Sequence, residues 1–179
     1  IKYFMKQEVV LVNELDEAIG RMEKMEAHQK ALLHRAFSVF IFNSQNEMLL
    51  QQRAFSKYHS GGLWSNACCS HPFPEEEVMT GACRRLQEEM GFTTELKKAF
   101  TFTYKAVFDN GLTEYEFDHV FMGIYDGPLL LNAEEVHDYK FLSVQQVEKE
   151  LKENASAYTA WFHIAFPKLQ LWLQHQLNN

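Results

Sequence analysis

The stretch from Ser70 to Phe92 constrains the fold more than any other part of the chain, because it reads as a loop leading into one well-delimited helix. Acidic residues follow Pro74, apolar residues recur through the next turns, and Gly91 is the residue type that most often follows a helix end. Proline is favoured at the start of a helix, where its missing N–H costs nothing. We therefore predict a helix over Glu75–Met90, with Pro74 at its first turn.

This stretch resembles the Nudix signature, in which a glycine, five residues, a glutamate and seven more residues precede Arg-Glu-apolar-any-Glu-Glu-any-Gly-apolar. The chain has Ser70, Glu76 and the run Arg84–Phe92 at the same spacing. It departs from the signature at two positions: Ser70 replaces the glycine, and Arg85 replaces the glutamate after the arginine. In Nudix hydrolases that glutamate helps to bind the metals that activate water against a diphosphate. A cation in its place favours holding a diphosphate over cutting it.

Apolar and alternating stretches bounded by turn residues predict the strands. The strongest turn signal is Asp109-Asn110-Gly111, whose Asn-Gly pair is typical of a tight hairpin, and Ser44-Gln45-Asn46 predicts a second hairpin. Strands are expected over Glu8–Asn13, His34–Asn43, Glu47–Arg53, Phe100–Phe108, Glu114–Tyr125 and Tyr139–Leu142.

The remaining segments are predicted as helices and loops. They comprise a helix capped by Ser143 and ending near Lys152, a helical region over Thr159–Leu177 interrupted at Pro167, a loop with a helical turn over Glu23–Leu33, and a loop over Lys57–Trp64. Strands in mixed order with a helix between them predict an α/β (α+β) fold, a Nudix-like α/β/α sandwich with a mixed sheet.

Composition and charge limit the class of protein. With 179 residues, 46% of them hydrophobic, the chain can bury one full core, so we expect a single domain over residues 1–179. Its 24 acidic and 17 basic side chains give a net charge of −7, which argues against nucleic acid as a partner. An anionic ligand would have to be bound by a few placed cations. Since Ile1 is not a native initiator, we expect residues 1–4, before Met5, to be a remnant foreign to the natural protein.

The cysteine content and the apolar runs bear on the compartment. Three cysteines, an odd and low number, are typical of free thiols in a reducing compartment. The sequence has no signal-peptide pattern and no apolar run long enough to cross a membrane. We therefore expect a cytoplasmic location, no membrane association and no obligatory protein partner.

Three histidines and two glutamates form a candidate metal site. Glu114 and Glu116 are two residues apart, so on a strand they project to the same face. With His28, His34 and His71 they offer three imidazoles and two carboxylates, a set that suits Mn²⁺, Zn²⁺ or Mg²⁺. The spacing of His28 and His34 matches no zinc-finger or zincin motif. The residues alone therefore leave open that the glutamates are a solvated strand face and the histidines incidental.

Several motifs together resemble type 1 isopentenyl-diphosphate isomerases. The most specific is the pair formed by Cys69-Ser70-His71-Pro72 and Glu114-Tyr115-Glu116 at this separation. The similarity spans nearly the whole chain, from about Glu8 to Leu177. It also includes Glu23-Lys24, Ala27-His28, His34, Ala36-Phe37-Ser38, Arg53-Ala54-Phe55-Ser56-Lys57, Ser65-Asn66-Ala67, the altered box ending at Gly91, Phe102-Thr103-Tyr104-Lys105 and Trp161-Phe162.

The resemblance implies an isomerase that interconverts isopentenyl diphosphate and dimethylallyl diphosphate in isoprenoid precursor biosynthesis. Cys69 would be the catalytic thiol and Glu116 the acid/base on the opposite face, with Tyr104 and Trp161 at the hydrocarbon pocket. Protonating an unactivated alkene gives a tertiary carbocation, so the site needs a strong acid, no free water and stabilising charge or π faces. Two groups on opposite faces can exchange the roles of acid and base without moving.

The resemblance also implies two cation sites and a set of diphosphate contacts. One divalent metal (Mn, Zn or Mg) would be bound by His28, His34, His71, Glu114 and Glu116. Magnesium on the substrate diphosphate would use Glu89 and the carbonyl oxygen of Cys69. The diphosphate itself would meet Lys24, Arg53, Lys57 and Arg85. Because the diphosphate does not react, its binding would hold the alkene between acid and base.

Two other functions stay open. A Nudix pyrophosphohydrolase acting on a nucleoside diphosphate derivative would use Glu76, Glu88 and Glu89, but it leaves Cys69 without a role. A non-catalytic diphosphate-binding module stabilised by a metal would not need both Cys69 and Glu116. The substitution Cys69→Ser separates the three, because it should abolish isomerisation but leave hydrolysis and binding largely intact.

Overall fold

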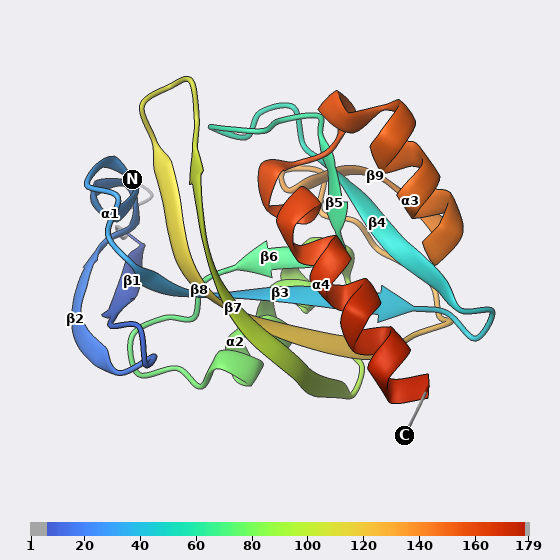
Figure 1. Cartoon of the computed structure of the whole chain (residues 1–179), viewed down its shortest axis with the longest axis horizontal. Coiled ribbons are helices and arrows are strands. Elements are labelled where there is room, and N and C mark those ends of the chain that lie inside the picture. Colours follow the sequence, from blue (N-terminus) through green and yellow to red (C-terminus); the bar gives the residue numbers. More distant parts are fainter. Residues whose placement is uncertain (1–6, 178–179) are drawn as a thin grey trace.

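The computed structural model describes residues 7–177, so the expectation for residues 1–4 lies outside the described part of the chain. Figure 1 shows a twisted sheet across the middle of the molecule, with helix α4 (Ala160–Leu177) in front of it and helix α2 (Val78–Met90) behind it. Helices on both sides of a sheet confirm the predicted sandwich.

Among the described residues the sheet has nine strands. They are β1 (Glu8–Val12), β2 (Ala18–Glu23), β3 (His34–Phe42), β4 (Glu47–Arg53), β5 (Trp64–Asn66), β6 (Cys68–Ser70), β7 (Leu96–Val107), β8 (Thr113–Ile124) and β9 (Val136–Ser143). The other elements are α1 (Lys24–Gln29), α3 (Val144–Glu153) and a 3₁₀ turn over Ala155–Ala157. Within residues 7–177 no helix is long and apolar enough to span a membrane.

Strand β3 organises the sheet. It runs parallel to β8, with His34 opposite Glu116, and antiparallel to β6, with Ser38 opposite Cys69. Strand β7 pairs antiparallel with β8 and places Tyr104 opposite Glu116. Parallel and antiparallel pairs together make the sheet mixed, as predicted. The register brings residues that are far apart in sequence to one end of β3.

Alternation along β3 divides its side chains between two cores. Phe40 belongs to the core under α4, whereas Val39 and Ile41 belong to the core under α2. Because successive side chains of a strand point to opposite faces, His34 and Ser38 share the face of Phe40. His34 and Ser38 therefore lie on the α4 side of the sheet, next to an aromatic core.

The helix predicted over Glu75–Met90 is confirmed, but it starts later than expected. It begins at Val78, because Glu75 adopts a φ of 69°, which no helix accommodates. Pro74 lies in the turn before the helix, so its predicted place at the first helical turn is wrong. Gly91 ends the helix with a φ of 77°, and its N–H donates to Gln87 O, as the sequence predicts.

The two predicted hairpins differ in outcome. The turn at Asp109-Asn110-Gly111 joins two long paired strands, β7 and β8. The turn at Ser44-Gln45-Asn46 also forms, but β3 and β4 pair only at Phe42 and Met48. Strands β6 and β8 already occupy the edges of β3, so β4 turns away to pair with β5 and β9.

The sequence does not predict strands β2, β5 and β6, because they are short or lack an alternating apolar pattern.

The interruption predicted at Pro167 is wrong. Helix α4 is continuous from Ala160 to Leu177. A proline inside a helix removes one hydrogen bond and usually kinks it. Here Phe162, Phe166 and Leu169 are buried against the sheet on both sides of the proline, and this packing holds the two halves in line. The capped helix after Ser143 is confirmed, with a capping box between Ser143 and Gln146.

Candidate active site

A cavity of about 130 Å³ collects most of the predicted site residues. Its walls come from α1, the ends of β4 and β6, helix α2, strands β7 and β8, and the start of α4. The predicted residues among them are Lys24, Arg53, Lys57, Cys69, His71, Arg85, Glu89, Tyr104, Glu114, Glu116 and Trp161. The other two, His28 and His34, are fully buried beside His71.

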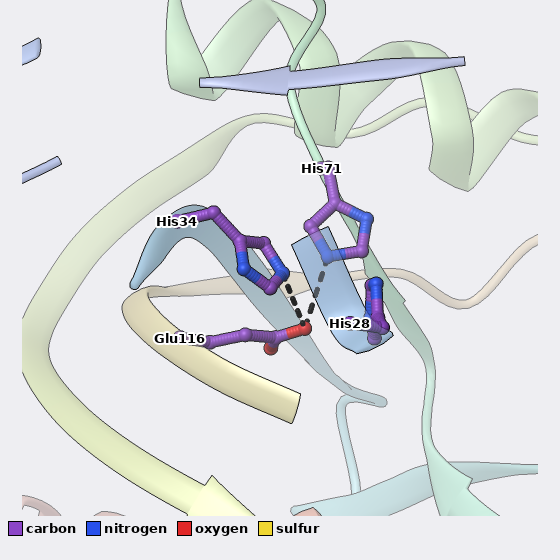
Figure 2. A group of neighbouring side chains, drawn as sticks. All are labelled: His28, His34, His71 and Glu116. Atoms are coloured by element: carbon purple, nitrogen blue, oxygen red, sulfur yellow. Dashed lines mark hydrogen bonds and ion pairs between the residues drawn. The ribbon is translucent and has the colours of Figure 1, made fainter. Parts of the chain in front are cut away.

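Four of the predicted metal ligands converge on one point. Figure 2 shows His28, His34, His71 and Glu116 pointing toward one another. One ligand atom from each residue lies within 4.8 Å of all the others, and all four residues are buried. They come from α1, the first residue of β3, the turn after β6 and the middle of β8. The β3–β8 register, which sets His34 opposite Glu116, is what makes this meeting possible.

Backbone contacts orient two of the imidazoles. His28 Nδ1 lies 2.6 Å from Lys24 O, and His34 Nδ1 lies 2.8 Å from Leu32 O. A carbonyl only accepts, so each Nδ1 carries the proton and each Nε2 presents a lone pair. Both Nε2 atoms are buried without a hydrogen-bond partner among the described residues. This arrangement, with one ring nitrogen anchored and the other free, is the usual setting of a metal-binding histidine.

Burial also favours the neutral rings that a metal requires. It lowers the pKa of His71 to about 3 and the pKa of His28 below its usual value. Neutral imidazoles and one carboxylate form a donor set suited to a divalent cation. The four residues therefore fit a metal ion, and they explain why so many polar atoms are buried together.

Glu114, Glu116 and Tyr104 form a hydrogen-bonded chain. The Tyr104 hydroxyl donates to Glu116 Oε2 at 2.6 Å and lies 3.0 Å from Glu114 Oε2. A phenol has one proton, so Tyr104 shares it between the two glutamates, with the shorter contact to Glu116. Burial and the neighbouring charge of Glu116 raise the pKa of Glu114. Although burial opposes it, contacts with His34 and His71 lower the pKa of Glu116. The two glutamates are thus inequivalent, with the pKa raised at Glu114 and lowered at Glu116.

Glu114 lies beside the group of four but outside it. Its Oε1 atom is 3.3 Å from His59 Nε2, and its Oε2 atom meets Tyr104. The same-face placement of Glu114 and Glu116 on β8 agrees with their spacing, since both are buried in the cavity wall. The role of Glu114 as a fifth ligand stays a prediction.

Cys69 enters the cavity from β6. Its Sγ donates to Asn66 Oδ1 at 3.0 Å and lies 3.5 Å from Ser38 Oγ, which donates to Asp118 Oδ2 at 2.6 Å. Burial, followed by the nearby Asp118, raises the pKa of the Cys69 thiol, so the sulfur keeps its proton. Cys68 points the other way into the core under α2, as expected for alternate residues of a strand.

Four cations also line the cavity. Burial, followed by the charges of Lys57, Arg85 and Arg53, lowers the pKa of Lys24 to about 8. Four cations that repel one another in a half-buried cavity favour an anion between them. Arg53 also lies 5.0 Å from the ring of Trp161, whose Nε1 donates to Ser65 Oγ at 2.8 Å. The predicted hydrocarbon wall and the predicted diphosphate contacts therefore meet.

Glu135 lies in the turn before β9, and it lines the same cavity. Its carboxylate pairs with Lys57 and lies 3.3 Å from Arg85 Nη2. Arg85 also donates to Glu89 Oε1 at 2.6 Å, and Glu89 Oε2 accepts from Gln51 at 2.9 Å. Carboxylates thus neutralise the cations where an anionic ligand would bind.

Sequence reasoning also missed several residues around the predicted groups. Asn66, Ser38 and Asp118 surround the thiol, and His59 lies against Glu114. Asn66 and Ser38 lie in motifs that carried the resemblance, so these motifs could have drawn attention to them. His59 stands in a glycine-containing loop without a pattern, and only the folded chain shows that it is buried.

The fold and the cavity define a class of protein. A family model described as NUDIX domain matches residues 32–162. The chain has the fold of a Deinococcus radiodurans protein with a TM-score of 0.69 and 17% identity, over 83% of this chain and 90% of that chain. The MutT protein from Methanosarcina mazei aligns with a TM-score of 0.63 and 21% identity, over 77% of this chain and 93% of that chain. The chain is a NUDIX domain protein.

Sequence relatives define the family more narrowly. The isopentenyl-diphosphate Delta-isomerase of Pectobacterium atrosepticum is 50% identical over 162 residues, covering 90% of each chain. The isomerase of Burkholderia multivorans is 44% identical over 172 residues, which is 96% of this chain and 98% of that protein. The chain belongs to the isopentenyl-diphosphate Delta-isomerase family, which confirms the family indicated by the motifs.

Proposed function

We propose that this chain interconverts isopentenyl diphosphate and dimethylallyl diphosphate, a step of isoprenoid precursor biosynthesis. The observation that carries the proposal is the placement of two proton-transfer groups. They come from the strands on the two edges of β3, and both line the same cavity. Cys69 comes from β6, and Glu116 with Tyr104 comes from β8 and β7. Acyl or phosphoryl transfer would not need a neutral thiol and a buried carboxylate that line one cavity.

The reaction requires one proton to be added to the alkene and another to be removed from the adjacent carbon. One group donates to the terminal carbon, a tertiary carbocation forms, and the other group accepts the proton that leaves. In the reverse direction the roles exchange, so neither side chain has to move. A divalent cation held by His28, His34, His71 and Glu116, with Glu114 as the proposed fifth ligand, would stabilise the carboxylate and so make the carboxyl a stronger acid.

The walls of the cavity support the carbocation. Tyr104 and Trp161 are both buried and line the cavity, so their π faces are available to a cation, worth about 2 kcal/mol when desolvated. Burial of these rings also keeps water away, which would otherwise capture the cation as an alcohol. Buried π faces beside the Glu116 carboxylate suit this intermediate better than they suit water-dependent hydrolysis.

The diphosphate is the proposed anchor of the substrate. Lys24, Arg53, Lys57 and Arg85 are its proposed contacts, with Mg²⁺ on the diphosphate held by Glu89 and the Cys69 carbonyl oxygen. The identity of the resident metal, Mn²⁺, Zn²⁺ or Mg²⁺, belongs to the same proposal. We also propose that the whole chain acts as one domain in the cytoplasm, and the three free cysteines support a reducing compartment.

The hydrolase alternative is disfavoured by the contacts of Arg85. Its guanidinium donates to Glu88 at 2.8 Å and to Glu89 at 2.6 Å, the acidic residues that a hydrolase would need for its metals. A cation beside both carboxylates competes with the metals that a hydrolase needs at both positions, whereas the isomerase proposal needs only Glu89, for the single Mg²⁺ on the diphosphate. The box is thereby better suited to holding a diphosphate than to cutting it.

Proton NMR in D₂O tests the proposal. Purified protein is incubated with isopentenyl diphosphate and Mg²⁺ while the vinyl protons and released phosphate are followed. Conversion to dimethylallyl diphosphate with deuterium incorporation and no phosphate release is the expected result. Unchanged substrate from folded, metal-loaded protein would reject the proposal, and phosphate release would favour the hydrolase.

A further inference from the structure

His59 is a loop residue that is buried in the cavity. It lies between β4 and β5, yet only 8% of its surface is exposed, and it lines the cavity with Trp161 and Glu114. Its ring stacks on Phe108 at 4.7 Å between centroids and meets the edge of Trp161 at 5.8 Å. A histidine held this firmly in a loop has a defined orientation, so the partners of its two nitrogens are informative.

Both nitrogens of His59 have a partner. Nε2 lies 3.3 Å from Glu114 Oε1, and Nδ1 lies 3.2 Å from Ser60 Oγ. A carboxyl oxygen accepts hydrogen bonds, and Glu114 Oε1 lies within reach of the ring nitrogen that faces it. His59 Nε2–H therefore donates to Glu114, and Nδ1 accepts from the Ser60 hydroxyl. This tautomer satisfies every polar atom of the ring.

We propose that His59 is a positioning residue for the acid–base chain. By donating to Oε1 of Glu114, it keeps Oε2 directed at Tyr104, and through Tyr104 at Glu116. The inference rests on the proposed function, because it concerns how that site is assembled. Without the Nε2–H donor, the Glu114 carboxyl can rotate. Tyr104 then loses one of its two acceptors, and Glu114 loses its orientation as the proposed fifth metal ligand.

The loop itself does not depend on the ring nitrogens. Arg53 donates to His59 O at 3.3 Å, and Asn110 donates to Tyr58 O at 3.4 Å. These backbone contacts join the loop to β4 and to the β7–β8 hairpin whichever side chain stands at position 59.

Two substitutions of His59 therefore separate the effect of ring packing from the effect of hydrogen bonding. His59→Phe keeps an aromatic ring for Phe108 and Trp161 but has no donor, whereas His59→Gln keeps an N–H donor and loses the ring.

The experiment compares wild type, His59→Phe and His59→Gln in two assays. The first is the kcat and KM for isopentenyl diphosphate, and the second is Mn²⁺ affinity by competition with a chromophoric chelator. Loss of a group that orients a metal ligand typically costs about 10–100-fold in metal affinity or activity. We expect His59→Phe to lose that factor in kcat and in Mn²⁺ affinity with an unchanged KM, and His59→Gln to keep most of both.

Two results would overturn the inference. One is His59→Phe with wild-type kcat and Mn²⁺ affinity. The other is a raised KM in both variants with unchanged Mn²⁺ binding, which would make His59 a packing residue. If wild type itself converts no substrate, the proposed function fails, and the Mn²⁺ assay alone then decides on His59. Thermal melts of the three proteins show whether each variant is folded.

Discussion

The two ends of the candidate active site are built in different ways. The acid–base end rests on neighbouring strands, with Cys69 on β6 and Glu116 on β8. The diphosphate end rests on long side chains that come from a helix start, a loop and a helix, among them Lys24, Lys57 and Arg85. At the first end His28 Nε2 is buried without a hydrogen-bond partner among the described residues, and His34 Nε2 has only Glu116 Oε1 at 3.6 Å. At the second end Lys57 and Arg85 already have carboxylate partners.

This difference indicates what each end contributes. Unpartnered buried nitrogens are costly unless a ligand satisfies them, so the strand-built end is preorganised for one arrangement. At the other end, Lys57 and Arg85 would exchange their carboxylate partners for the diphosphate when the substrate binds. Substitutions at the strand-built end should therefore act on kcat, and substitutions at the diphosphate end should act on KM.

The largest expected effect is that of Cys69→Ser. A serine hydroxyl at the same place is a far weaker acid than a thiol, and removal of a proton-transfer group costs about 10²–10⁴-fold in rate. We expect kcat to fall by that factor and KM to stay near the wild-type value, as measured by NMR in D₂O. Retention of wild-type turnover would contradict the assignment of the thiol, and a raised KM alone would contradict the division between the two ends.

Arg85→Lys is expected to have the opposite signature. Lysine keeps the charge but loses the planar group that binds two oxygens at once. Hydrogen bonds to charged groups contribute about 1.5–3 kcal/mol, so KM should rise about 10–100-fold while kcat is retained. Steady-state kinetics decide, with Lys97→Arg as a control because the Lys97 side chain is 81% exposed. A lower kcat at unchanged KM would place Arg85 in the chemistry.

The pKa of Lys24 sharpens the comparison through pH. Burial and neighbouring cations lower it to about 8, so the ammonium form that would bind a diphosphate is lost as the pH rises through that value. KM should therefore rise from pH 7 to pH 9, by at most about tenfold per unit for a single proton. Lys24→Arg should remove this dependence, since arginine stays charged throughout. A KM that is flat in wild type would contradict the prediction.

Glu135→Gln should have the smallest effect, and it should strengthen the binding of an anion although it removes a charged residue from the site. The carboxylate competes with an anionic ligand for Lys57 and Arg85, but the pair is partly exposed, with 21% and 22% of the Lys57 and Glu135 side chains accessible. Such pairs contribute up to about 1 kcal/mol, so the variant should bind inorganic pyrophosphate a few-fold more tightly in calorimetry. Weaker binding would mean that Glu135 aligns the cations instead.

The sequence predicts the strand-built end better than the other end. Glu114 and Glu116 lie two apart in an apolar strand, so their spacing alone indicates a shared face, whereas Cys69 came to attention through the motifs that carry the family resemblance. His59 and Glu135 lie in loops, where no periodicity distinguishes a buried side chain from an exposed one. Pro167 shows the same limit for a helix, because local propensity predicts a break that tertiary packing overrides.

The central position of β3 limits how a lineage could retune this site. Cys69 faces Ser38 and Glu116 faces His34, so the placement of acid and base is counted in residues along one strand. A slip of one residue turns every side chain to the wrong face, and the smallest slip that restores the face moves the strand about 6.6 Å. A change of register therefore moves the acid or the base by a distance much larger than proton transfer tolerates. Fine tuning is left to side-chain length, which the short thiol on one side and the long phenol of Tyr104 on the other supply.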